Sequence, residues 1–260
     1  MNIFLDQNLY QEKREYFKID LSTITAGLSH QQSNLKVIIK YCFTNNLNLI
    51  KPIFLLEGKH NNNNQLITDL SEYYDLNGIT VNGKLFKLYD DDVKYTYTIK
   101  KKIYKYGLLR TDPIFKNLKN VNIVIPYKQD IIDTANKVLQ ELDEYMCIHV
   151  RRGDRITNEQ IDINTQPDNI IKMINKYKPK KVYIMTNKFN ELKSLSNIEN
   201  IYFYTNFNFL NKFNDNYYLF CIENNIMDFA KIRCSTFNVK LNNANANYYH
   251  CYLTNHPGWQ

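Results

Sequence analysis

The sequence predicts a globular α/β fold: one observation indicates the α/β class, and two others indicate a globular chain. Short runs rich in β-branched and apolar residues alternate with segments of helical periodicity, most clearly in the second half of the chain. Hydrophobic residues make up 44% of the chain and charged residues 23%, which is typical of a globular protein. A chain of 260 residues can also bury a sufficient core without disulfides or metals. Alternation of strands and helices indicates parallel sheets with crossover helices.

The first half of the chain has the less regular pattern. We expect a strand over residues 17–24, a loop over 26–32 and a helix that opens near Ser33. The polar run at 61–64 predicts a surface loop. The buried face of the helix is expected to consist of Leu35, Ile38, Ile39, Cys42 and Phe43.

The second half alternates regularly. A helix over 130–145 is expected to feed a strand over 146–150. Asp168 is a candidate N-cap for a helix that stops before Pro179, and a strand over 182–185 follows. A short helix near Glu191, a strand over 201–204, a helix over 217–226 and a turn over 234–237 complete the pattern. The first of these helices carries its apolar residues at helical spacing, namely Ile131, Ala135, Val138, Leu139 and Leu142.

This organisation predicts two Rossmann-like units, residues 1–130 and 131–260, with a cleft between them. No internal repeat and no Pro- or Ser-rich linker is evident, and we place the boundary within residues 126–135. In open α/β sheets, ligands bind at the carboxyl ends of the strands. The cleft is therefore the expected active site.

Charge leaves two classes of partner open. The formal net charge of +7 is compatible with a nucleic-acid-binding protein, whose affinity would fall steeply with salt. The Lys residues, however, are spread along the sequence and form no single stripe, so we expect no nucleic-acid partner. An excess of basic residues also suits an enzyme whose substrate is a nucleoside diphosphate, because a site that binds a diphosphate needs fixed positive charge.

The cysteine and acidic residues predict no metal site. The five cysteines show no zinc-ligand spacing, and we expect reduced thiols. The acidic run at 90–92 falls in a polar segment, where solvated carboxylates are the rule. We therefore expect neither a metal nor another cofactor.

The sequence shows no secretion or membrane signal. The N-terminal segment is polar within a few residues, and no stretch approaches the roughly 20 apolar residues of a transmembrane helix. The expected location is the cytoplasm. Asn, Ile and Lys are abundant, a bias that resembles translation from an AT-rich genome such as that of a giant virus, a protist or an AT-rich bacterium. A viral protein would be placed in the host cytoplasm.

The most informative segment is 147–154, in which an apolar strand runs directly into His149, Arg151, Arg152 and Asp154. The planar fork of Arg donates two parallel, charge-assisted hydrogen bonds to phosphate oxygens. Arg151 can thus hold a diphosphate leaving group, His149 can contact the nucleoside, and Asp154 can orient the arginines. The alternative structural interpretation is a solvated turn after a strand. The Arg-Gly-Asp tripeptide could also indicate adhesion, which the absence of a secretion signal disfavours.

The string His149-Val-Arg151-Arg152-Gly-Asp154 resembles the HxRRxD motif of the alpha-1,2-, alpha-1,6- and protein O-fucosyltransferases and the nodulation fucosyltransferases. This resemblance implies a GT-B fold and an inverting, metal-independent transfer of fucose from GDP-fucose. It also implies that Arg151 binds the diphosphate, with His149 and Arg152 as further donor contacts. The implied acceptor is a hydroxyl group of a glycan or a protein.

Two segments further along the chain resemble other regions of the same family. Residues 181–187 resemble its VYxATD segment, from which Met185 and Asn187 depart. Asp228 and residues 234–237 together resemble the third region of the family, although the spacing between them is longer than in the alpha-1,6 enzymes. In that region an Asp contacts guanine, and hydroxyl groups at the start of a helix hold phosphate. The alternatives are a surface acid at Asp228 and an N-cap at the hydroxyl residues. The donor contacts that this resemblance implies are Asp228, Ser235, Thr236 and Phe237.

The segment 26–31 falls where the family carries a Gly-rich loop such as GRFGNQ. Gly27 would allow close approach of the backbone to the substrate. His30 stands where the family has Asn. The resemblance implies that Gly27 and His30 contact the donor GDP-fucose, and an ordinary loop histidine is the alternative for His30.

The resemblance implies Glu159, by its spacing from the motif, as the general base that accepts the acceptor proton. Asp154 is the second candidate. Two other functions stay open: a glycosyltransferase that uses another nucleotide sugar, and a catalytically silent homologue that binds nucleotide.

Overall fold

The structure is a computed structural model, and it describes residues 15–19, 21, 25–58, 69–91, 97–99, 109, 112–152, 159–211, 213, 215–235 and 250–253. The chain divides into two compact units, Met1–Lys128 and Gln129–Gln260. The sequence analysis placed the division between residues 130 and 131. Both units combine helices with parallel sheet, so the predicted α/β fold class is confirmed.

Unit 1 is built on a four-stranded sheet in the order β7-β3-β1-β8, in which every pairing is parallel. Of the strand predicted over 17–24, residues 17–19 belong to β1, Leu21 is outside a strand, and residues 20 and 22–24 lie outside the described residues. Phe17 and Ile19 are buried, because alternate residues of a strand point to the same face. The strands are β1 (Tyr16–Ile19), β3 (Asn48–Ile50), β7 (Leu88–Tyr89) and β8 (Tyr97–Ile99).

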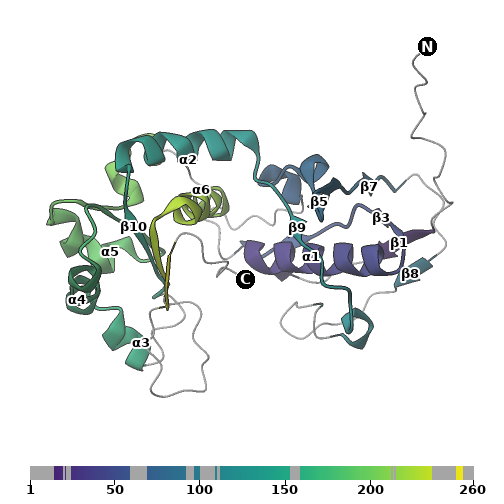
Figure 1. The fold of residues 1–260 in the computed structure, drawn as a ribbon, viewed down its shortest axis with the longest axis horizontal. Helices are drawn as coiled ribbons and strands as arrows, with labels where there is room; N and C mark the ends of the chain where they lie inside the picture. The colour runs from purple at the N-terminus through teal and green to yellow at the C-terminus, as the bar shows by residue number, and fades with distance from the viewer. Residues whose placement is uncertain are drawn as a thin grey trace, which may run out of the picture. The chain divides into compact units, whose positions relative to one another are not determined.

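Helix α1 (Leu28–Thr44) lies beside β1 and β3 (Figure 1). It begins five residues before the predicted start near Ser33, so the loop predicted over 26–32 is wrong for most of its length. The reason is that Leu28 and Gln31 continue the buried face by helical spacing, at 1% and 0% exposure. Phe43, predicted to be buried, is 39% exposed.

The other strands of unit 1 form two small sheets. β2 (Thr25–Ala26) pairs in parallel with β4 (Leu55–Leu56). An antiparallel sheet in the order β6-β5-β9 consists of β5 (Thr80–Val81), β6 (Lys84–Leu85) and β9 (Ile123–Val124). Short 3-10 helices lie at η2 (Leu70–Glu72), η3 (Leu76–Gly78) and η6 (Pro113–Phe115).

The sequence analysis did not predict the β5–β6 hairpin, although its turn carries a clear signal. Asn82 and Gly83 have φ angles of 50° and 78°, so both lie in the left-handed region. A type I′ turn requires this conformation at both central residues, and Asn-Gly is its preferred dipeptide.

Unit 2 contains a five-stranded sheet in the order β12-β11-β10-β13-β14, with an antiparallel pairing only between β13 and β14. The strand predicted over 146–150 is confirmed, and the one over 182–185 extends by one residue. The turn predicted over 234–237 is wrong at its start, because Cys234 and Ser235 belong to a strand. The strands are β10 (Met146–Val150), β11 (Val182–Thr186), β12 (Ile201–Tyr202), β13 (Ile232–Ser235) and β14 (His250–Leu253).

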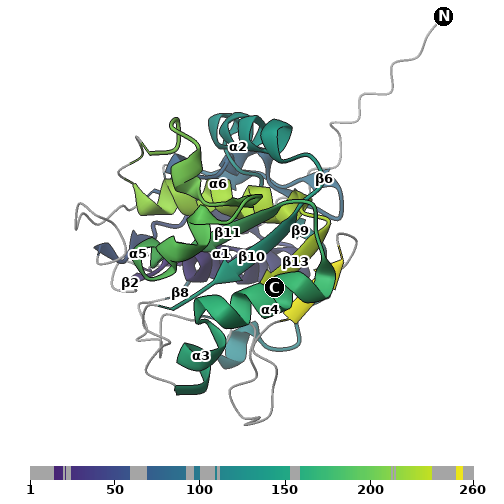
Figure 2. The same ribbon diagram turned by 90° about the vertical axis from the view of Figure 1, so that its left-hand side faces the viewer.

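Helices cover both faces of this sheet. Figure 2 shows α2 and α6 on one side of β10, β11 and β13, with α4 on the other side. Asp168 is not the N-cap of α4: Gln166 takes that position, Pro167 is the first helical residue, and Asp168 lies in the first turn. The helices are α2 (Gln129–Leu142), α3 (Glu159–Asn164), α4 (Pro167–Tyr177), α5 (Phe189–Leu192) and α6 (Asn216–Phe229), with 3-10 turns η8 (Lys193–Asn197) and η9 (Tyr204–Asn206).

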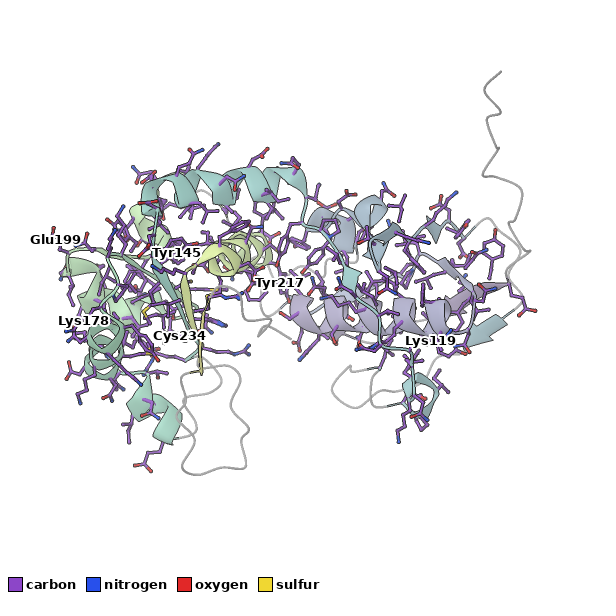
Figure 3. All side chains as sticks on the ribbon, in the orientation of Figure 1. Lys119, Tyr145, Lys178, Glu199, Tyr217 and Cys234 are labelled. Carbon is purple, nitrogen blue, oxygen red and sulfur yellow. The ribbon has the colours of Figure 1, made fainter. Side chains whose placement is uncertain are left out.

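Successive side chains of β10 point to opposite faces of the sheet. Met146, Ile148 and Val150 belong to a core cluster with residues of α4 and α5. Cys147 and His149 therefore point to the opposite face, which α6 covers. At the start of β10, the hydroxyl group of Tyr145 donates a hydrogen bond to the carbonyl of Ile226 in α6, and Figure 3 labels this tyrosine.

Within the described part of the chain, no helix combines the length and apolar character that a membrane span requires.

Candidate functional site

The strand order of unit 2 by itself predicts the position of a ligand site. From β10 the chain proceeds to β11 and then β12 on one side, and it returns after α6 to place β13 on the other side of β10. The connections thus leave β10 in opposite directions. In doubly wound sheets, ligands bind at the carboxyl ends of the two strands that flank such a reversal. The expected position lies between the ends of β10 and β13.

The motif residues occupy this position. His149 of β10 lies directly opposite Ser235 of β13, and both are at the carboxyl ends of their strands. Arg151 and Arg152 follow β10 directly. The structure therefore brings together His149, the two arginines and Ser235. Asp154, Thr236 and Phe237 lie outside the described residues, and their assignments stay predictions.

His149 lies in a shielded environment. Its Nδ1 atom has no contact with solvent, although the residue as a whole is only half-buried. Burial, together with a smaller effect of the positive charge of Arg151, lowers the pKa of His149 to about 4. The imidazole is therefore neutral at physiological pH, and one ring nitrogen can donate a hydrogen bond while the other accepts one.

Arg151 is half-buried, and its charge acts on His149. The two side chains thus belong to the same end of the sheet, as expected for residues two apart in an extended segment. A fixed cation beside a neutral imidazole at a strand end can bind a phosphate group and a polar group of a nucleoside.

Arg152 has different surroundings. It is 6% exposed, and its guanidinium makes hydrogen bonds to residues that follow β10 and β11. Nε donates to Oε2 of Glu191 at 2.6 Å, and Nη2 donates to Oδ1 of Asp162 at 2.5 Å. Nη1 donates to Oγ1 of Thr165 at 2.7 Å and to the carbonyl of Asp162 at 3.3 Å. We call Arg152, Asp162, Thr165 and Glu191 the arginine clamp. This geometry disfavours the predicted direct contact of Arg152 with the donor, because protein groups occupy most of its N–H donors.

Glu159 is the first residue of α3 and is exposed. Its side chain is therefore accessible from solvent. The structure does not test its predicted role as general base, so this role stays a prediction.

The structure does not bring Asp228 to the motif. Asp228 lies in the last turn of α6, and Nη1 of Arg233 donates to its Oδ1 at 3.5 Å. Just beyond this turn, the amide of Lys231 donates to the carbonyl of Tyr145, at the amino end of β10. A strand of this length separates its two ends by on the order of 13 Å. Asp228 and Arg151 therefore lie at opposite edges of the sheet, which does not support the guanine contact predicted for Asp228.

Gly27 and His30 belong to unit 1. Gly27 is the N-cap of α1, with φ of −66° and ψ of 160°, a conformation that any residue adopts. Its carbonyl accepts hydrogen bonds from the amides of His30 and Gln31. His30 is an exposed residue in the first turn of the helix, not in a loop. Their predicted contacts with the donor stay predictions.

The sequence analysis missed the three partners of Arg152. Because a buried arginine requires hydrogen-bond acceptors, the acidic residues of the sequence were the available signal for these partners. Many acidic residues follow the two strands, however, and spacing alone does not select Asp162 and Glu191 among them.

The sequence analysis also missed a buried carboxyl group in α6. Glu223 is 5% exposed, and the hydroxyl of Tyr183 donates to its Oε1 at 3.0 Å. Burial raises the pKa of Glu223 to about 8, although the hydrogen bond from Tyr183 acts in the opposite direction. This carboxyl group is therefore largely protonated at neutral pH and lies in the layer between α6 and β11.

Among the residues that the structure describes, no group of His, Cys, Asp and Glu side chains has an arrangement suited to a metal ion.

Comparisons with known proteins give a structural match without a sequence match. No protein-family model matches the chain, and no curated protein matches it. The structure is similar to the crystal structure of POFUT1 in complex with GDP, with a TM-score of 0.51 and 10% identity over 87% of this chain and 92% of that chain. Two structures of the fucosyltransferase NodZ from Bradyrhizobium, one of them with selenomethionine, give a TM-score of 0.49 at 10% and 11% identity, over 93% of this chain and 99% of each. On the POFUT1 match, the chain has the mixed α/β fold of the GT-B fucosyltransferases.

Proposed function

We propose that the chain is an inverting, metal-independent fucosyltransferase that uses GDP-fucose as donor and a hydroxyl group of a glycan or protein as acceptor. The observation that carries this proposal is the location of His149 and Arg151 at the strand reversal between β10 and β13. The similarity of the fold to that of POFUT1, which was solved with GDP, supports a guanine nucleotide as the ligand.

In the proposed reaction, Arg151 binds the diphosphate. As the bond between C1 of fucose and the β-phosphate oxygen breaks, its electron pair stays on the GDP oxygen, and the cation stabilises the increasing negative charge. The neutral imidazole of His149 hydrogen-bonds to the nucleoside. On β13, the backbone of Ser235 lies directly opposite His149.

The acceptor hydroxyl attacks C1 from the side opposite the leaving GDP, which inverts the anomeric centre. Its proton passes to a carboxylate, for which we propose Glu159 because it is exposed at the start of α3. The products are the fucosylated acceptor, GDP and a protonated carboxyl group that returns its proton to water.

The test is calorimetric titration of the full chain, without added metal, with GDP, GDP-fucose, GDP-mannose, UDP and dTDP. We expect selective binding of the guanine nucleotides. Arg151→Ala removes a charge-assisted contact worth about 1.5–3 kcal/mol, so affinity for GDP should fall about 10- to 100-fold.

Lys231→Ala is the matched control, because it removes the same charge from an exposed residue beside the amino end of β10. It should leave GDP affinity unchanged. Equal affinity for all five nucleotides, or no binding of GDP, would contradict the proposed donor. Preference for UDP or dTDP would indicate another nucleotide sugar, and GDP binding without hydrolysis or transfer of fucose would indicate a silent homologue.

A further inference from the structure

The two adjacent arginines of the motif have divergent surroundings. Val150 and Arg152 lie toward the side of the sheet that α5 covers, since Val150 packs with Leu192 and Arg152 pairs with Glu191. His149 lies toward the α6 side, and Arg151 is close enough for its charge to act on the imidazole. The two adjacent arginines therefore have different neighbours.

The arginine clamp connects three segments at the carboxyl edge of the sheet. Arg152 belongs to the chain that leaves β10, Asp162 and Thr165 belong to α3 and the turn after it, and Glu191 belongs to α5, which follows β11. Thr165 is fully buried, and its hydroxyl also donates to the carbonyl of Asp162 at 3.2 Å. The clamp is therefore a junction between separate elements of unit 2, in which Arg152 and Thr165 are buried and the two carboxylates are partly exposed.

Each carboxylate partner of Arg152 has a second side-chain contact. Nε2 of Gln166 donates to Oδ1 of Asp162 at 3.0 Å, and Nζ of Lys188 lies 3.9 Å from Oε1 of Glu191. A second contact restricts the rotamers of Asp162 and Glu191, so these side chains lose less entropy when Arg152 binds them.

We propose that Arg152 is a positioning residue and not a donor contact: through the clamp it holds the chain after β10 so that Arg151 is directed at the diphosphate. This inference rests on the proposed function. The clamp also fixes α3 through Asp162, one turn after Glu159, and so holds the proposed base on the same support.

The two possible roles of Arg152 predict opposite effects when its partners are neutralised. If Arg152 bound phosphate, Asp162→Asn with Glu191→Gln would release its charge and leave GDP affinity unchanged or higher. If Arg152 acts through the clamp, the same double variant loosens the chain at Arg151, and GDP affinity should fall about three- to tenfold. These substitutions keep the size and shape of the two side chains and remove only the negative charges that hold the guanidinium, so the fold should be retained.

Arg152→Lys makes a second distinction. A lysine can still bind a phosphate as a point charge, but it cannot donate in the directions of a fork. The clamp predicts that Arg152→Lys weakens GDP binding nearly as much as Arg152→Ala. It also predicts that the Arg152→Ala, Glu191→Gln double variant binds GDP about as weakly as Arg152→Ala alone, because either change disrupts the same arginine clamp.

The experiment measures the GDP dissociation constant of each variant by calorimetry, with thermal unfolding as the check on folding. Glu199→Gln is the matched control, because Glu199 is an exposed acid of unit 2 at the turn before β12 (Figure 3). Unchanged or tighter GDP binding in the Asp162→Asn, Glu191→Gln variant would overturn the positioning role and leave the proposed function intact. Failure of the wild-type chain to bind GDP would overturn both.

Discussion

The neighbouring residues Arg151 and Arg152 carry the same charge and have different environments. Arg152 is buried and surrounded by carboxylate, hydroxyl and carbonyl oxygens, whereas Arg151 is half-buried beside a neutral imidazole. Burying a guanidinium without partners is costly, so the clamp residues are required wherever Arg152 is buried. The sequence string alone treats the two arginines as equivalent, and only their burial distinguishes them.

His149 gives a residue-scale prediction. Because its folded-state pKa is lowered to about 4, the imidazole should stay neutral as the pH falls from 7 to 5. We expect its ring carbon and nitrogen NMR shifts to stay constant over this range, with assignment by loss of the signal in His149→Gln. Titration of His149 near the ordinary histidine pKa of about 6.5 would contradict the shielded environment.

At the scale of elements, α1 shows how buried polar groups hold a helix in place. Gln31 and Asn34 are 0% and 1% exposed, and Nδ2 of Asn34 donates to Oε1 of Gln31 at 2.9 Å. Nε2 of Gln31 donates to the carbonyl of Leu55 at 2.7 Å, and Oδ1 of Asn34 accepts from the amide of Leu109 at 3.0 Å. The helix is thus connected to β4 and to a segment distant in sequence.

This network predicts the effect of Asn34→Ala. The substitution leaves the amide of Leu109 and the side-chain carbonyl of Gln31 without these contacts, which costs about 1–3 kcal/mol of unfolding free energy. Urea denaturation should show the loss. Ser29→Ala, at an exposed position of the same helix, should change stability by less than about 0.5 kcal/mol. Equal effects of the two substitutions would contradict the network.

At the scale of the whole molecule, the buried pair of Glu223 and Tyr183 affects the dependence of stability on pH. The folded-state pKa of Glu223 is about 8, against 4.5 for the ordinary side chain. Between these values the folded chain retains a proton that the unfolded chain releases. The contribution of this group is therefore fully present below about pH 4.5 and decreases as the pH rises through about 8.

Glu223→Gln tests this contribution. Gln cannot ionise, and its side-chain carbonyl can still accept the hydrogen bond from Tyr183. We expect the unfolding free energy of the variant to decline less between pH 5 and 8 than that of the wild type, with the greatest relative gain at pH 8. Denaturation curves at a series of pH values measure this difference. Parallel pH profiles for the two proteins would show that Glu223 ionises normally in the folded state.

Several parts of the fold and site follow from the sequence alone. The α/β class and the strand over 146–150 follow because hydrophobic periodicity is a local property, and the charges at the carboxyl end of this strand predict a ligand site there. The HxRRxD resemblance indicated the fold to which the structural match also points. The Asn-Gly turn of the β5–β6 hairpin was readable as well, but it lies between strands only two residues long.

The tertiary structure alone decided which of the predicted residues lie close together. It placed Ser235 opposite His149, directed Arg152 into the clamp and left Asp228 at the other edge of the sheet. Strand order and register arise from contacts between segments far apart in the chain, and these contacts leave no trace in local spacing. The sequence by itself determined which side chains are available at each strand end. The packing of the strands determined which of them meet.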